Sequence, residues 1–321
     1  GLVAAAFYGH PSQRMPVIAI TGTNGKTSSA WWLAAALSHP GLLSDQELPA
    51  LNPCGFAGTL GMGLPGRLQA TGLTTPGPVQ LQAGLRRMLD EGARSCAMEA
   101  SSIGLAERRM AGLAVRVAVF TNFTQDHLDW HGSMQAYAAA KARVFGAAGA
   151  MVLNRDDEWV AAMRPAPVAV KTAKGSTKGA PRPAPRTVIT FGSGLPAQPG
   201  DYGLETVHGM TWLVRAHDAE GPRGADDALH LQRLMPADAL RIQGRHNALN
   251  ALAALALAHA AGCPLAPMLY GLREYRGEPH RVQSIGRFAG VEYFDDSKGT
   301  NVGATVAALQ GLGADRKLVV I

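Results

Sequence analysis

Short apolar runs alternate along the first half of the chain with longer segments in which apolar and polar residues mix. The run V-I-A-I-T, from Val17 to Thr21, predicts a buried strand, and Lys26 to Leu37 predicts the helix that follows it. The same alternation predicts strands at 54–62, 95–98, 115–121 and 151–154 and helices at 79–90 and 133–145. Such alternation is typical of a mostly parallel sheet covered by helices on both faces.

The second half of the chain has a different pattern. Strands at 188–191 and 210–214 are expected to form a smaller antiparallel portion, and a long alanine- and leucine-rich helix is expected from Gly244 to Gly262. A break follows at 272–279, and the order strand, helix, strand is then predicted at 291–294, 301–312 and 318–321. We therefore expect an α/β fold with a P-loop-type central domain over residues 1–276 and the start of a Rossmann-like second domain at 277–321.

Composition narrows the class of protein. A length of 321 residues gives room for about two domains, and 47% apolar residues suffice for buried cores. The net charge is +6, but Lys and Arg are scattered apart from one excess at 164–186, which favours anionic small molecules over nucleic acid. The three cysteines lie far apart without C-x-x-C spacing, and no run of 18 apolar residues occurs. We expect a cytoplasmic monomer without membrane insertion.

The stretch T-G-T-N-G-K-T joins the first predicted strand to its helix. Backbone N–H groups of such a loop point at one spot, and the helix adds the positive end of its dipole there. Lys26 opposes that dipole, so it indicates a bound anion, although an ordinary strand-turn-helix remains the alternative. The predicted phosphate-binding residues are Gly22, Thr23, Asn24, Gly25, Lys26, Thr27 and Ser28, with the Thr27 hydroxyl also on magnesium.

Polar side chains follow two further predicted strands. Glu99 stands at the end of the strand at 95–98, where it either binds magnesium or is a solvated strand terminus. His127 follows the strand at 115–121, together with Asn122, and is either a metal ligand or a structural hydrogen-bonding residue. Because ligands gather beyond the carboxyl ends of parallel strands, we expect these side chains to meet Lys26.

Other candidates are ambiguous from pattern alone. Lys141 on the predicted helix at 133–145 has the pattern of a solvated helical lysine. Asn247 and Asn250 lie three residues apart on one helical face and either bind a nucleotide or serve as a cap and a core hydrogen-bonding residue. Arg281 and Asp296 follow the predicted break and are placed to close over the phosphate and the ribose of a nucleotide.

These motifs occur together in one known family. The stretches TGTNGKT, MEASS, FTNFTQDHLDWHG, YAAAKARVF, GRHNALNALAA, GEPHR and DDSKGTN resemble those of the Mur ligases, the ATP-dependent enzymes that add amino acids to peptidoglycan precursors. The resemblance implies catalytic roles for Lys26, Lys141 and His127. It implies two Mg²⁺ sites, of which Thr27, Glu99, His127 and a carbamylated Lys141 provide ligands. ATP would be bound by the glycine loop and by Asn247, Asn250, Arg281 and Asp296.

The two halves of the chain resemble different branches of this family. Up to about Asn122, FYGHPS, LTTPGP and MEASSIGL resemble the MurE branch, which adds diaminopimelate. From about Thr124, TQDHLDWHGSM, LMPADALRIQGRHN and YFDDSKGTNVGATVAAL resemble the MurD branch, which adds D-glutamate to UDP-N-acetylmuramoyl-L-alanine. The resemblance implies that a UDP-linked precursor and an amino acid are bound by Thr74, Thr75, Ser101, Arg109, Asn122, Lys298 and Thr300.

The longer MurD-like portion favours D-glutamate addition. A MurE-type ligase, a folylpolyglutamate synthetase-like ligase and an inactive ATP-binding fragment remain alternatives. The first residue is Gly1 and the chain ends in an apolar run. We therefore expect a fragment that lacks the UDP-binding N-terminal domain and most of the C-terminal domain.

Overall fold

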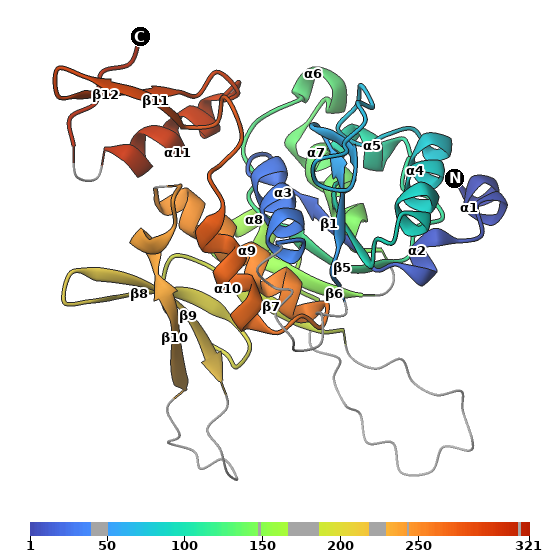
Figure 1. Cartoon of the computed structure of the whole chain (residues 1–321), viewed down its shortest axis with the longest axis horizontal. Coiled ribbons are helices and arrows are strands. Elements are labelled where there is room, and N and C mark those ends of the chain that lie inside the picture. The colour runs from blue at the N-terminus through green and yellow to red at the C-terminus, as the bar shows by residue number, and fades with distance from the viewer. Residues whose placement is uncertain (40–50, 147–148, 166–185, 218–228, 243, 314–315) are drawn as a thin grey trace.

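The computed structural model describes residues 1–39, 51–146, 149–165, 186–217, 229–242, 244–313 and 316–321 (Figure 1). Its main feature is a ten-stranded sheet with the order β10-β9-β8-β7-β6-β5-β1-β4-β2-β3. The strands of this sheet are β1 (Val17–Thr21), β2 (Cys54–Gly58), β3 (Gly61–Gly63), β4 (Ser95–Glu99), β5 (Val115–Phe120), β6 (Ala150–Asn154), β7 (Val188–Phe191), β8 (Tyr202–Val207), β9 (Met210–His217) and β10 (His230–Pro236).

The middle of the sheet is parallel, as the apolar runs predict. Strand β1 pairs in parallel with β4 on one side and β5 on the other, and β2, β6 and β7 extend the parallel region. All five residues of β1 are buried, because parallel strands are covered on both faces. The carboxyl ends of β1, β4 and β5 therefore lie side by side at one edge of the sheet.

Helices cover both faces of this sheet (Figure 1). They are α1 (Leu2–Phe7), α2 (Pro11–Arg14), α3 (Lys26–Leu37), α4 (Pro78–Asp90), α5 (Ser102–Ala106), α6 (Leu128–His131), α7 (Met134–Ala142), α8 (Glu158–Ala161), α9 (Arg245–Ala260) and α10 (Leu265–Glu274). Alternate residues of β1 face opposite ways, so Ile18 and Ile20 join the core under α3, α9 and α10. Val17 and Ala19 join the second core, under α4 and α7.

The last part of the chain stands apart from the large sheet. Strands β11 (Gln283–Phe288) and β12 (Val291–Asp295) form a two-stranded antiparallel sheet, and α11 (Val302–Leu312) follows. Figure 1 shows α11 between this hairpin and the central region. Two glycines seat α11 closely: a Cβ on Gly303 would lie 2.7 Å from Thr124 Oγ1, and one on Gly311 would lie 2.7 Å from His246 Nδ1.

Some predicted elements differ from the structure. The expected single strand at 54–62 is the hairpin β2–β3, because the chain turns between Gly58 and Gly61. The segment 188–191 is predicted to lie in an antiparallel portion, but β7 is parallel to both β6 and β8. At this end of the continuous sheet, the antiparallel pairs are β8 with β9 and β9 with β10. Residues 318–321 do not form the expected strand. Most of the basic segment at 164–186 lies outside the described residues.

The sequence predicts no membrane insertion, and the length and polarity of the helices bear on this prediction. Within the described part of the chain, every helix is too short or too polar to cross a bilayer.

Trp32 of α3 links two helices and provides a test of the packing. Its side chain is fully buried, its indole N–H donates to Leu272 O at 3.1 Å, and its ring stacks on Tyr275 with centroids 4.9 Å apart. We expect Trp32→Ala to lower the free energy of unfolding by about 3–5 kcal/mol, because it leaves a cavity in the larger core. Urea unfolding measures this change. Trp130→Ala is the control, since that side chain is 46% exposed, and an equal loss in both variants would contradict the prediction.

Candidate functional site

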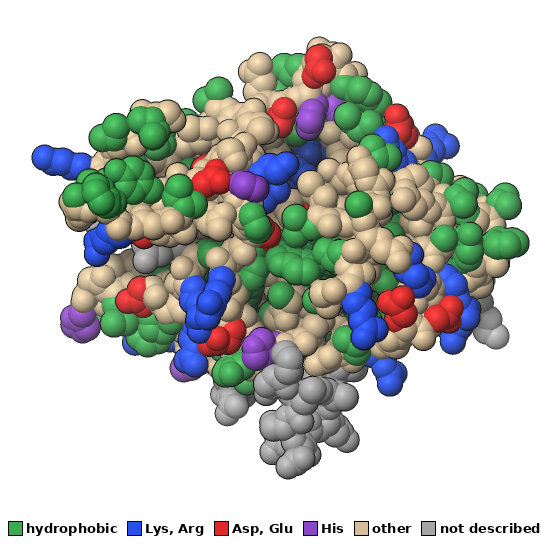
Figure 2. All heavy atoms as spheres, turned by 45° about the horizontal axis from the view of Figure 1, so that its top comes forward, with side chains coloured by type: hydrophobic (Ala, Val, Ile, Leu, Met, Phe, Trp, Pro, Cys, Tyr) green, Lys and Arg blue, Asp and Glu red, His purple; other side chains and the backbone are tan. Residues whose placement is uncertain are grey.

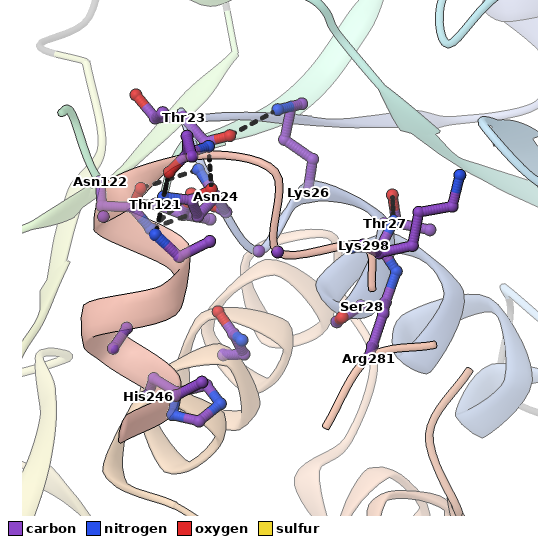
Figure 3. A pocket seen from close by; sticks show the side chains of 18 of the residues that line it. Thr23, Asn24, Lys26, Thr27, Ser28, Thr121, Asn122, His246, Arg281 and Lys298 are labelled. Atoms are coloured by element: carbon purple, nitrogen blue, oxygen red, sulfur yellow. Dashed lines mark hydrogen bonds between the residues drawn. The ribbon is translucent and has the colours of Figure 1, made fainter. Parts of the chain in front are cut away.

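A cavity of about 480 Å³ lies beyond the carboxyl ends of β1, β4 and β5. It is bordered by the loop after β1, the start of α9, the segment after α10 and the first turns of α11 (Figure 3). Figure 2 shows basic, acidic and histidine side chains close together in the upper middle of the face drawn there. The predicted site residues that line the cavity are Thr23, Asn24, Gly25, Lys26, Thr27, Ser28, Thr74, Glu99, Asn122, His127, Asn247, Asn250, Arg281, Asp296, Lys298 and Thr300.

The loop after β1 takes its shape from two glycines. Gly22 and Gly25 have φ angles of 149° and 80°, and Gly25 is the residue before α3. A Cβ on Gly22 would lie 1.9 Å from Thr121 Oγ1, and one on Gly25 would lie 2.6 Å from Asn250 Oδ1. Only glycine fits these close approaches. The loop therefore sits directly against β5 and α9.

Two side chains after β5 hold this loop. The Asn24 N–H donates to Asn122 Oδ1 at 2.9 Å, and Asn122 Nδ2 donates back to Asn24 O at 3.0 Å. The Thr121 hydroxyl also donates to Asn24 O, at 2.6 Å. Asn122 was predicted to bind substrate; in the structure its amide fixes the backbone of the loop.

The Lys26 ammonium folds back against the backbone of the loop that precedes it. Its Nζ donates to Gly22 O and Thr23 O, each at 2.9 Å. Burial lowers the pKa of Lys26, while the carboxylates of Glu99 and Asp126 raise it. An anion bound at the start of α3 would offer this cation a stronger partner than two carbonyl oxygens.

Thr27 and Glu99 form a pair of oxygen donors. The Thr27 hydroxyl donates to Glu99 Oε2 at 2.8 Å, and the Thr59 N–H donates to Glu99 Oε1 at 2.8 Å. Glu99 is fully buried, so its interpretation as a solvated strand terminus is wrong. Burial raises the pKa of Glu99, while its bond with Thr59 and the charge of Lys26 lower it. Two adjacent oxygens of this kind suit Mg²⁺, which prefers hard oxygen ligands.

Lys141 is also inside the protein. Its side chain is 1% exposed, its Nζ donates to Gly22 O at 2.6 Å, and Nζ lies 4.7 Å from the centre of the Tyr137 ring. The solvated helical lysine that its pattern indicates is therefore wrong. Burial holds the pKa of Lys141 well below its usual value, and the charge of Lys26 lowers it further. A lowered pKa enlarges the fraction of the amine that is neutral, and the neutral amine is the nucleophilic form.

His127 lies at the start of α6 and borders the cavity. Its φ angle is 50°, its side chain is 48% exposed, and its Nδ1 lies 3.8 Å from Asp126 Oδ1. Within the described residues, no group of three or more His, Cys, Asp and Glu side chains is arranged to hold a metal ion. A metal ion beside Glu99 or His127 would therefore take its further ligands from hydroxyl groups, water, substrate oxygens or a modified lysine.

Residues from the second half of the chain complete the cavity. Asn250 Nδ2 donates to Asn247 Oδ1 at 3.4 Å, so both amides share one face of α9. Arg281 Nη2 donates to the Thr27 hydroxyl at 3.0 Å, and Asp296 Oδ1 accepts from the Val282 N–H at 3.1 Å. The structure thus brings the regions on either side of the predicted break to one place.

Three of the predicted substrate-binding residues do not line the cavity. Thr75 is fully buried, and its hydroxyl donates to Glu99 O and accepts from the Ser101 N–H, both at 2.9 Å. Arg109 donates to Thr75 O at 2.9 Å and pairs with Glu107 at 2.6 Å. Thr75, Ser101 and Arg109 therefore form a cluster that supports the end of β4, beside the cavity.

Asn301 is a contact residue that the sequence analysis missed. It caps α11 by accepting from the Ala304 N–H at 2.9 Å, and it exchanges two amide hydrogen bonds with Asn24, at 3.0 and 3.3 Å. Its Nδ2 also donates to Asp126 Oδ2 at 3.2 Å. The pattern N-V-G-A before a helix signals the cap, but no local signal indicates a partner 277 residues away.

The Asn301 contacts predict a local effect on α11. We expect Asn301→Ala to destabilise the first turn of α11 by about 1 kcal/mol, because it loses its cap and its attachment to the loop. Amide hydrogen exchange at Ala304 and Thr305 should become roughly fivefold faster. Gln310→Ala, an exposed change on the same helix, should leave these rates unchanged. Equal protection in both variants would contradict the attachment.

The arrangement can be compared with known proteins. A sequence model of the Mur ligase middle domain matches residues 20–182, just over half of the chain. The chain belongs to the Mur ligase family. This membership confirms the resemblance found in the motifs.

Three curated relatives with high sequence identity to this chain carry the same name. Three proteins called UDP-N-acetylmuramoylalanine–D-glutamate ligase match this Mur ligase chain. The one from Albidiferax ferrireducens is 64% identical over 214 residues, which cover 65% of this chain and 41% of the relative. Those from Polaromonas sp. and Burkholderia ambifaria are 51% and 45% identical over 96% and 95% of this chain, and 47% and 55% of their own lengths. The chain spans about half the length of the curated relatives it matches.

Solved Mur ligase structures share the fold. A UDP-N-acetylmuramoyl-L-alanyl-D-glutamate–2,6-diaminopimelate ligase is 26% identical, with a TM-score of 0.64 over 89% of this chain and 52% of its own. MurF from Acinetobacter baumannii is 21% identical, with a TM-score of 0.62 over 96% of this chain and 56% of its own. The second likeness supports the α/β fold alone.

Proposed function

We propose that this Mur ligase chain contributes the ATP-binding site of a ligase that joins D-glutamate to UDP-N-acetylmuramoyl-L-alanine. The observation that carries the proposal is the meeting of Lys26, Thr27, Glu99 and Lys141 around the glycine loop, in a chain whose relatives are named for that reaction. Three free, buried cysteines support action in a reducing compartment, the cytoplasm, and we propose that the protein acts there as a monomer.

The reaction would proceed through an acyl phosphate. The γ-phosphoryl group passes from ATP to a carboxylate oxygen of the UDP-linked alanine, so the bond to the bridging oxygen breaks and ADP leaves. The amine of D-glutamate then attacks the acyl carbon and loses a proton, and phosphate departs to leave an amide. Lys26 would turn from Gly22 O and Thr23 O to the β- and γ-phosphates. The protein mainly positions groups and neutralises charge.

We propose that two Mg²⁺ ions bind at this site. Thr27 and Glu99 would hold the first, because their oxygens lie 2.8 Å apart and the carboxylate is buried. Lys141 and His127 would hold the second. Lys141 would supply oxygens as a carbamate, in which its neutral amine nitrogen bonds to the carbon of carbon dioxide and one amine proton is released to solvent. The metals would stabilise negative charge on the transferred phosphoryl group.

The remaining predicted residues would divide between nucleotide and substrates. Asn247, Asn250, Arg281 and Asp296 line the cavity on the side of α9 and the segment after α10, where they would bind ATP. Lys298 and Thr300, before α11, would meet the incoming D-glutamate. Thr74, on the cavity wall, and Asn122 would meet the UDP-linked precursor, while Thr75, Ser101 and Arg109 would support that region or reach a longer substrate.

A second candidate is the addition of diaminopimelate. The solved diaminopimelate ligase at 26% identity and the MurE-like residues before Asn122 favour it. ADP release separates the two reactions when the protein is given D-glutamate with UDP-N-acetylmuramoyl-L-alanine, or diaminopimelate with the D-glutamyl precursor. Stimulation by the first pair alone supports our proposal. Stimulation by the second pair, or by folate with glutamate, overturns it, and ATP binding without any amino-acid-dependent ADP release indicates an inactive remnant.

A further inference from the structure

Glu278 is a buried carboxylate at the cavity. It belongs to the stretch GEPHR, but the sequence analysis gave it no role. It lies in the segment between α10 and β11, its side chain is 2% exposed, and it borders the cavity with Ser28 and Arg281. A buried carboxylate costs free energy unless its oxygens are paired, and an apolar residue is often the more stable choice. The position of Glu278 therefore points to a role other than stability.

Both oxygens of Glu278 have donors from different elements. The Tyr275 hydroxyl donates to Oε1, and the Ser28 hydroxyl donates to Oε2 at 3.1 Å. Arg281 Nε lies 3.8 Å from Oε2. Ser28 belongs to the first turn of α3, directly after Lys26 and Thr27. Glu278 thus ties the segment after α10 to the first turn of α3, directly after the glycine loop.

Arg281 lies between Glu278 and the predicted magnesium ligands. Its Nε faces Glu278, while its Nη2 donates to the Thr27 hydroxyl, which in turn donates to Glu99. Figure 3 shows Arg281 beside Ser28 and near Thr27 at the start of α3. At this end of a phosphate-binding loop the Lys reaches the β- and γ-phosphates, and the Thr hydroxyl binds the Mg²⁺ that accompanies them. The ion pair with Glu278 and the hydrogen bond to Thr27 restrict the orientations of this guanidinium, so it is oriented in advance for a phosphate there.

We propose that Glu278 is a positioning residue for phosphoryl transfer, which orients Arg281 toward the terminal phosphate of ATP and fixes Ser28 beside it. This role rests on the proposed function, because it requires ATP at the loop. Glu278 acts through Arg281 and need not touch the nucleotide. A contribution to folding alone is the competing explanation, and it would affect every ligand of the site alike.

The test compares an ATP analogue that cannot be hydrolysed with ADP, since only the first has the terminal phosphate. Glu278→Gln keeps the shape of the side chain and removes its charge. We expect its affinity for the analogue to fall about tenfold, and its affinity for ADP to fall less than about threefold. Glu274→Gln is the matched control, because that carboxylate pairs with Arg241 at 2.6 Å and does not border the cavity. Its two affinities should equal those of the unmodified chain.

Two further variants separate positioning from folding. Tyr275→Phe removes the hydroxyl but leaves the ring stacked on Trp32, and we expect a weaker loss of the same kind. In an Arg281→Ala background, Glu278→Gln should change the affinity for the analogue less than about twofold, because the guanidinium that Glu278 orients is absent. Equal losses for the analogue and ADP, no loss for either, or a full tenfold effect without Arg281 would overturn the role of Glu278. An unmodified chain that binds neither nucleotide would instead overturn the proposed function, and this inference with it.

Discussion

ATP turnover is expected to fall at least about a hundredfold when Lys26 is replaced by alanine. The variant loses the cation at the start of α3, where the proposed reaction would place the negative charge of the transferred phosphoryl group. Folding should be little changed, because Gly22 O keeps the bond from Lys141 and, among the described residues, the hydrogen bonds of the Lys26 side chain go to two backbone oxygens. The measurement is ADP release at saturating substrate, with circular dichroism to verify the fold.

Lys317→Ala is the control for loss of a lysine. Lys317 is exposed and does not border the cavity, so its removal should leave ADP release unchanged. Near-normal turnover in Lys26→Ala would refute the role of the loop in phosphate binding.

Lys141→Met is expected to lower turnover by a similar factor, about a hundredfold. Methionine has nearly the length of lysine but no amine, so it cannot form the carbamate that would hold the second metal. The buried site should accept it, since Gly22 O retains the Lys26 donor and an apolar side chain removes the cost of burying an amine. With ¹³C-labelled bicarbonate, NMR should detect a carbamate in the unmodified chain and none in the variant. A carbamate signal that survives in the variant would place the modification elsewhere.

The pH dependence of stability offers an independent test of Lys141. Burial lowers the pKa of this amine in the folded protein, so the unfolded chain binds more protons between that lowered pKa and the usual lysine value. The free energy of unfolding should therefore rise with pH through this window, and the stabilisation is lost as pH falls through the folded pKa. Lys141→Met should lack this part of the slope in urea unfolding at several pH values. Parallel slopes in the two proteins would show that the buried amine is not the cause.

The Lys26 and Lys141 side chains share one hydrogen-bond acceptor in the glycine loop after β1. Lys26 and Lys141 both donate to Gly22 O, at 2.9 and 2.6 Å. Two cations at one carbonyl repel each other, and the charge of Lys26 is one cause of the lowered pKa of Lys141. A neutral or carbamylated Lys141 relieves that repulsion. Helix α7, which carries Lys141, and the glycine loop after β1 are thereby coupled electrostatically.

Local sequence was sufficient for the elements with a strong local signal. The apolar run before T-G-T-N-G-K-T determined β1, and Ser133 and Asn301 provide the side-chain caps that start α7 and α11. Local sequence was not sufficient to predict β8, β10 and α10. Their residues are polar or mixed, and these elements depend on pairing or packing with other parts of the chain.

The sequence by itself determined the α/β class, the glycine loop after β1 and the polar residues that follow the parallel strands, because these depend on periodicity and on short-range turn chemistry. Only the tertiary structure decided the burial of Lys141, the full burial of Glu99 and the contacts of Glu278 and Asn301 with the loop. Burial and partnership between residues up to 277 positions apart arise when strands and helices pack together. No local pattern encodes the electrostatic environment that such packing creates, and that environment sets the chemistry of a carboxylate or an amine.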